Sequence, residues 1–75
     1  MNTMELFHYN CIKSLEKQLK ETVAVFLDKK QWLISVGFTR EIEYYENKIC
    51  DLQNSITEEI KAMEHARLHF GKKVA

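Results

Sequence analysis

A seven-residue repeat of apolar side chains in the second half of the chain most constrains its fold. The repeat consists of Ile42, Ile49, Ile56, Met63 and Phe70. Three residues after most of these positions a further small or apolar side chain follows, namely Tyr45, Leu52 and Ala66. This spacing places one apolar seam along a single α-helix. The second half is therefore expected to be one long helix that needs a partner along its length.

The first half supplies a matching apolar series, and a turn signal separates the two halves. Gly37 is suited to end a helix and Thr39 to begin the next. If the chain reverses there, the two series meet in register: Leu33 faces Ile42, Phe26 faces Ile49, Leu19 faces Ile56 and Ile12 faces Met63. The sequence thus predicts an all-α fold, an antiparallel two-helix hairpin that forms a single domain over residues 1–75.

Local signals set the expected ends of the helices. Asn2 followed by Glu5 has the spacing of an N-terminal capping box, and Gly71 follows the last apolar position. The predicted elements are a helix over about 3–35, a turn at 36–39, a helix over about 39–70 and a frayed tail at 71–75. Glu59 occupies a seam position, so we expect a slight helix rotation that exposes Glu59 and buries the neighbouring Ile60.

Apolar side chains beside the seam predict self-association. A chain of 75 residues buries only about 60% of its unfolded surface when it folds alone. The side chains that a lone hairpin leaves in water, and that we assign to a dimer interface, are Val23, Val25, Trp32 and Ile60. A second hairpin would cover them, giving a homodimeric antiparallel four-helix bundle. A monomer with a few exposed apolar side chains is the alternative.

Nothing in the sequence indicates catalysis. It has no glycine-rich phosphate loop, no nucleophile elbow and no carboxylate pair that the periodicity would bury. We therefore expect neither an enzyme nor a cofactor. The expected architecture resembles, in shape alone, the small hairpin dimers that serve as adaptors, inhibitors and RNA-organising factors on plasmids and phages, and a fold does not fix a function.

Aromatic residues near the turn favour a protein-protein interaction module. Such residues are over-represented among binding hot spots. The candidate partner-binding residues are Trp32, Phe38, Tyr44 and Tyr45. Packing within the bundle and the turn is the competing explanation, in particular for Trp32 and Tyr45.

A nucleic-acid-binding regulator is the first alternative, because basic residues recur along the first helix. They are Lys13, Lys17, Lys20, Lys29 and Lys30. A stripe of this kind can follow a phosphate backbone. However, Glu16 and Glu21 interrupt it, and the chain balances 11 basic against 11 acidic residues. A solvated helix face explains the same pattern.

A zinc-stabilised hairpin is the second alternative. The hairpin register brings four possible ligands to its open end: His8, Cys11, His65 and His69. Surface histidines are the competing explanation. Cys11 and Cys50 fall about 20 Å apart in this register, given a rise of about 1.5 Å per residue, so no disulfide joins them. Without a secretory signal or a membrane span, we expect a cytoplasmic protein and no membrane partner.

Overall fold

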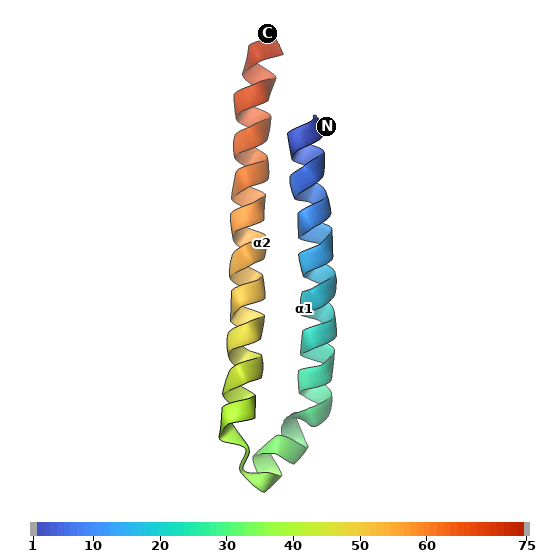
Figure 1. Ribbon diagram of the computed structural model, residues 1–75, viewed down its shortest axis with the longest axis vertical. Coiled ribbons are helices and arrows are strands. Elements are labelled where there is room, and N and C mark those ends of the chain that lie inside the picture. The colour runs from blue at the N-terminus through green and yellow to red at the C-terminus, as the bar shows by residue number, and fades with distance from the viewer. Residues whose placement is uncertain (1, 75) are drawn as a thin grey trace.

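Two long helices lie side by side and run in opposite directions in the computed structural model (Figure 1). The structure describes the backbone of residues 2–74 and the side chains of residues 2–68. Helix α1 spans Thr3–Val36 and helix α2 spans Thr39–Val74. The predicted antiparallel hairpin is confirmed. Within the described residues, neither helix combines the length and the apolar character needed to cross a membrane.

The first helix begins at the predicted capping box. Asn2 Oδ1 accepts a hydrogen bond from the backbone N–H of Glu5 at 2.8 Å, and Glu5 Oε1 accepts one from the backbone N–H of Asn2 at 3.5 Å. These bonds satisfy donors that have no partner inside the helix. An N-cap of this kind stabilises a helix by about 1 kcal/mol. It sets the residue at which α1 begins, at the open end of the hairpin.

A left-handed glycine makes the reversal between the helices. Gly37 has φ 76°, and its N–H donates to the carbonyl of Ile34 at 3.2 Å. The N–H of Phe38 donates to the carbonyl of Leu33 at 3.0 Å. Together these two bonds form a Schellman motif, which satisfies carbonyls left over at the helix end. Because α2 begins directly afterwards at Thr39, the turn is short and defined.

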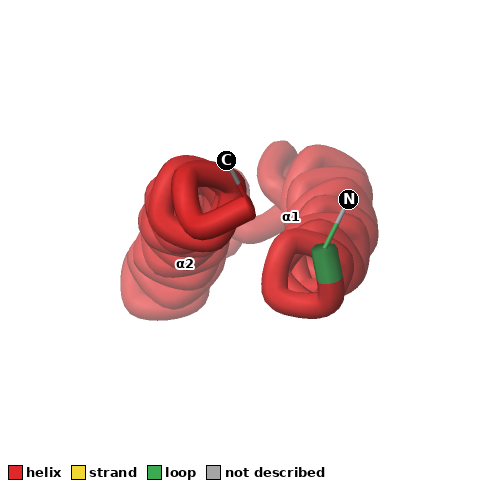
Figure 2. The backbone as a smooth tube through the Cα atoms, turned by 90° about the horizontal axis from the view of Figure 1, so that it is seen from above, coloured by secondary structure: helices red, strands yellow, loops and turns green. Residues whose placement is uncertain are grey.

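The core is one seam between the two helices, which lie side by side in the end-on view (Figure 2). Leu33 is fully buried, and Phe26 is stacked on Tyr45 with ring centroids 5.5 Å apart. Among the described side chains, the buried apolar residues all come from the predicted heptad series: Ile12, Phe26, Leu33, Leu52 and Ala66. The periodicity therefore identified the buried face of each helix.

The second helix does not end where the sequence suggested. We expected it to stop at Phe70 with a frayed tail from Gly71, but α2 continues to Val74. A glycine inside a helix costs only about 1 kcal/mol relative to alanine, which is too little to end a helix by itself. The prediction of the C-terminal boundary was wrong for this reason.

The hairpin exposes more surface than a folded chain of its size normally does. Its extents are 61 × 15 × 10 Å and its radius of gyration is 17.2 Å, whereas a compact 75-residue domain has about 11 Å. The accessible surface is 5950 Å², against about 4800 Å² for a typical folded monomer of 8.9 kDa. The excess is about 1100 Å². It follows directly from having two helices and no third layer.

Candidate protein interaction surface

Large apolar side chains are exposed in two parts of α1, within residues 4–9 and 25–36. Most of those that are at least partly exposed belong to this helix: Met4, Leu6, Phe7, Tyr9, Val25, Leu27, Trp32, Ile34 and Val36. The turn adds Phe38, and α2 contributes Tyr44, Ile60 and Leu68. The outer surface of α2 is correspondingly more polar. Exposed apolar patches of this kind are typical of surfaces that another protein covers.

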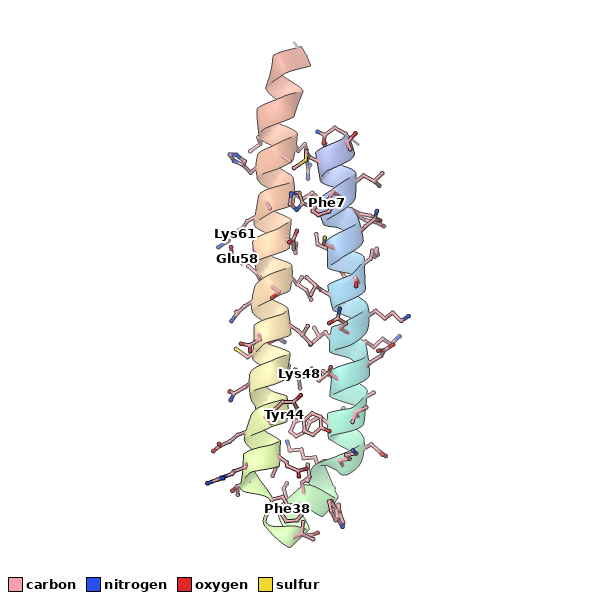
Figure 3. The ribbon with its side chains drawn as sticks, viewed as in Figure 1. Phe7, Phe38, Tyr44, Lys48, Glu58 and Lys61 are labelled. Carbon is pink, nitrogen blue, oxygen red and sulfur yellow. The ribbon has the colours of Figure 1, made fainter. Side chains whose placement is uncertain are left out.

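An aromatic cluster, which we define as Trp32, Phe38 and Tyr44, occupies the turn end of the hairpin. These side chains are exposed by 57%, 46% and 59%. The rings of Trp32 and Phe38 meet edge to face with centroids 5.6 Å apart. Figure 3 places Phe38 at the turn and Tyr44 slightly above it on α2, with Phe7 near the opposite end. The predicted partner-binding residues Trp32, Phe38 and Tyr44 are thus accessible to a partner.

Tyr45, the fourth predicted partner-binding residue, lies in the seam instead. Its ring stacks on Phe26, and its side chain is only partly exposed. The rings of Tyr45 and Tyr44 meet edge to face with centroids 5.5 Å apart. Tyr45 therefore connects Tyr44, a member of the aromatic cluster, to the core.

A shallow hollow lies next to the aromatic cluster, between the two helices. The residues that line it are Glu21, Thr22, Val25, Tyr44, Tyr45 and Lys48. The ammonium group of Lys48 lies 5.9 Å from the centroid of the Tyr44 ring. Apolar and aromatic side chains thus lie beside one acidic and one basic residue. Such a surface fits a protein side chain better than a highly charged ligand.

The four predicted dimer-interface residues lie on two different flanks of the seam. Val25 and Trp32 are seven residues apart and so lie on the same flank of α1, with exposures of 42% and 57%. Val23 is two residues before Val25 and lies on the other flank, where it is half-buried. Ile60 is 39% exposed beside the seam of α2. A second hairpin that packs through a single face would therefore cover either Val25 and Trp32 or Val23 and Ile60.

A polar pair crosses the seam near the open end. His8 Nδ1 and Glu59 Oε2 are 2.6 Å apart, and their side chains are 16% and 30% exposed. The expected rotation that would expose Glu59 and bury Ile60 is therefore wrong. The reason is that His8, one turn before Ile12 on the facing helix, supplies a hydrogen-bonding partner at the seam. The signal was present in the sequence, because both residues occupy seam positions of the heptad repeat.

The same end also holds a charged pair, formed by Arg67 and Glu5. Arg67 Nε lies 3.8 Å from Glu5 Oε2, with the carboxylate side chain 15% exposed and the arginine side chain 61% exposed. Glu5 also belongs to the capping box, so this contact connects the start of α1 to α2. Partly exposed ion pairs contribute only about 0–1 kcal/mol. The pair therefore adds little to the stability of the hairpin.

Three of the four possible zinc ligands, His8, Cys11 and His65, have described side chains, and these three do not form a metal site. His8 is bonded to Glu59, Cys11 is half-buried and His65 is exposed. The side chain of His69 lies outside the described residues. Over residues 2–68, no group of three His, Cys, Asp or Glu side chains is arranged to hold a metal ion. Cys11 and Cys50 are free thiols.

The predicted basic stripe is exposed, although two of its lysines contact aromatic rings. The ammonium group of Lys13 lies 5.3 Å from the centroid of the Tyr9 ring, and that of Lys30 lies 5.5 Å from the Phe26 ring. The exposed members are Lys13, Lys17, Lys20, Lys29 and Lys30. Lys30 therefore covers the edge of the core as well as facing solvent.

The fold and its surface define a class of protein only at the level of an antiparallel helical hairpin with an aromatic cluster at its turn. Comparison of the chain with protein-family models, with curated proteins and with solved structures gives no match.

Proposed function

We propose that this protein is a non-enzymatic protein-protein interaction module that forms a homodimer of helical hairpins. In this proposal the aromatic cluster contributes to binding another protein. The observation that carries it is the exposure of Phe38 and Tyr44 at the turn end of the rod, with Trp32 in contact with Phe38. An adaptor, an inhibitor or another small regulator would act through such a surface.

The geometry of the aromatic cluster supports this proposal. Aromatic rings bury large areas on binding and lose little conformational entropy, so they dominate many binding energies. Here Phe38 follows a hydrogen-bonded turn and its ring already contacts Trp32. Tyr44 is supported by Tyr45 from the seam. Rings that are held in place before binding reduce the ordering cost of association.

The excess surface supports self-association. The hairpin exposes about 1100 Å² more than a typical monomer of its mass, and a standard interface buries about 800 Å² per partner. A second copy of the chain is always available to cover such an area. The four-helix bundle that results is the commonest way for two hairpins to share a core.

The surrounding features fit a module that acts by binding. The hollow beside Tyr44 contains no paired carboxylates and no histidine next to a nucleophile. Cys11 and Cys50 as free thiols fit a reducing compartment, so we place the module in the cytoplasm. Nucleic acid is the less favoured partner, because the basic stripe carries interspersed acidic residues and the net charge is zero.

Affinity capture with matched variants tests the proposed binding surface. The tagged full-length chain is expressed in the organism that encodes it and isolated with its bound proteins after nuclease treatment. We expect Phe38→Ser combined with Tyr44→Ser to reduce the amount of a specific bound protein at least about tenfold, which corresponds to 1.4 kcal/mol. Leu68→Ser is the control, because Leu68 is 63% exposed on α2 and lies far from the turn.

Two results would contradict the proposal. One is a bound protein that both variants retain equally, which would place the binding surface elsewhere. The other is the recovery of nucleic acid without any specific protein, together with its loss when Lys13, Lys17 and Lys20 are changed to glutamine. That second outcome would favour the nucleic-acid-binding regulator instead.

A further inference from the structure

One flank of α1 carries a complete heptad line without a charge. The line consists of Met4, Cys11, Gln18, Val25 and Trp32, each seven residues after the one before. Met4, Val25 and Trp32 are exposed by 44%, 42% and 57%, Gln18 is exposed, and Cys11 is half-buried. We call this set the uncharged line. It runs from the open end of the hairpin to the turn.

The equivalent line on the opposite flank is different. Its members are Asn2, Tyr9, Glu16, Val23 and Lys30. Glu16 lies at its centre, so two copies packed symmetrically through this flank would bring two carboxylates together. Burying an unpaired charge is costly, and like charges in contact repel. The two flanks therefore differ in their suitability for a symmetric contact.

The uncharged lines of two copies are complementary when the two α1 helices run antiparallel. With Gln18 on a two-fold axis, Gln18 faces its own copy, Cys11 faces Val25, and Met4 faces Trp32. The amide group of glutamine both donates and accepts, so two copies can bond to each other. The small Cys11 side chain then contacts the branched Val25. The flexible Met4 contacts the indole ring of Trp32, which is a favourable sulfur-aromatic contact.

We propose that a second copy of this chain packs on the uncharged line, antiparallel, with Gln18 on the two-fold axis. This inference rests on the proposed homodimer and adds its face and register. α1 of each copy lies against α1 of the other, since the same face of α2 carries Glu41, Lys48 and Ser55 and offers less apolar surface. The turn end of one copy then lies beside the open end of its partner.

The hairpin as a whole exposes enough surface for a dimer contact. Its accessible surface exceeds that of a typical monomer of its mass by about 1100 Å², and each partner loses roughly 800 Å² in a standard interface. Each end of the dimer would also place Phe7 of one copy, 59% exposed, near the aromatic cluster of the other. The dimer would thus present two equivalent aromatic ends.

Cysteine cross-linking tests the register. In a Cys11→Ser, Cys50→Ser background, Gln18→Cys is oxidised in the full-length chain at micromolar concentration. Packed helices have axes about 8–10 Å apart, which brings facing Cα atoms within the range of about 4.4–6.8 Å that a disulfide spans. We expect most of the chain to form a disulfide-linked dimer. Separately, Val25→Cys with Cys50→Ser should cross-link to the native Cys11 of the other copy.

Two matched controls identify the face. Lys17→Cys, one residue away on the outer surface, and Glu16→Cys, on the opposite flank, should remain unlinked in the same background. Sedimentation before oxidation reports separately whether the chain dimerises. A dimer that cross-links through Glu16→Cys and not Gln18→Cys would overturn the proposed face, and a dimer in which none of the variants cross-links would overturn the register. In both cases the proposed homodimer would survive, whereas a monomer before oxidation would refute the homodimer itself.

Discussion

Replacing Phe26 with alanine should remove much of the stability of the hairpin. The side chain is only 7% exposed and stacks on Tyr45 at 5.5 Å, with Lys30 above its ring. Truncating a buried phenylalanine costs about 3–5 kcal/mol, and loss of the ring stacking accounts for about 0.5–1.5 kcal/mol of that. A domain of this length has a total stability of about 4–11 kcal/mol. The melting temperature should therefore fall by at least about 12 °C.

Thermal and urea unfolding followed by circular dichroism measures this change. Protein concentration must be the same for each variant, because association shifts the apparent stability. Leu27→Ala is the matched control: Leu27 is adjacent in sequence but 63% exposed, so its truncation should change stability by less than about 0.5 kcal/mol. Ile49→Ala, in the predicted facing position, should also cost about 2–5 kcal/mol. If Phe26→Ala and Ile49→Ala both cost less than about 0.5 kcal/mol, the seam is in the wrong register.

Two further predictions concern the polar pair and the turn. Replacing His8 and Glu59 together by leucine should raise the melting temperature, because apolar side chains of similar size often stabilise by about 1–4 kcal/mol when they replace a partly buried polar pair. A lower melting temperature for this double variant would show that the pair stabilises the hairpin more than an apolar contact. Gly37→Ala should destabilise by about 1–2 kcal/mol in urea unfolding, because an alanine pays for the left-handed backbone even though nothing lies within 4 Å of the added Cβ. An unchanged urea midpoint would mean that the reversal does not depend on this conformation.

Much of the fold was predictable because the heptad repeats and the caps are local signals. Ile12, Phe26 and Leu33 lie in the core where their spacing placed them, and the capping box begins α1 as expected. The end of α2 was not predictable from Gly71, since a single glycine weakens a helix without stopping it. The local sequence therefore predicted the core positions and the start of α1 better than the end of α2.

Glu59 and Tyr45 show where predictions made from one helix at a time were insufficient. Glu59 was expected in solvent because a slight helix rotation would bury the neighbouring Ile60 in its place, but His8 on α1 bonds to Glu59 across the seam. That contact depends on the register between the helices, which no single segment contains. Tyr45 shows the same limitation: its neighbour Tyr44 is exposed, while Tyr45 itself stacks on a ring of the other helix.

The most direct test of the proposed homodimer is its mass in solution. Sedimentation equilibrium of the wild-type chain at micromolar concentration should give twice 8.9 kDa. Trp32→Glu should shift this towards the monomer, because it places a charge in a contact that excludes water. Leu68→Glu should leave the mass unchanged, since Leu68 is exposed on α2 away from the uncharged line. A wild-type mass of 8.9 kDa that does not change with concentration would contradict the account.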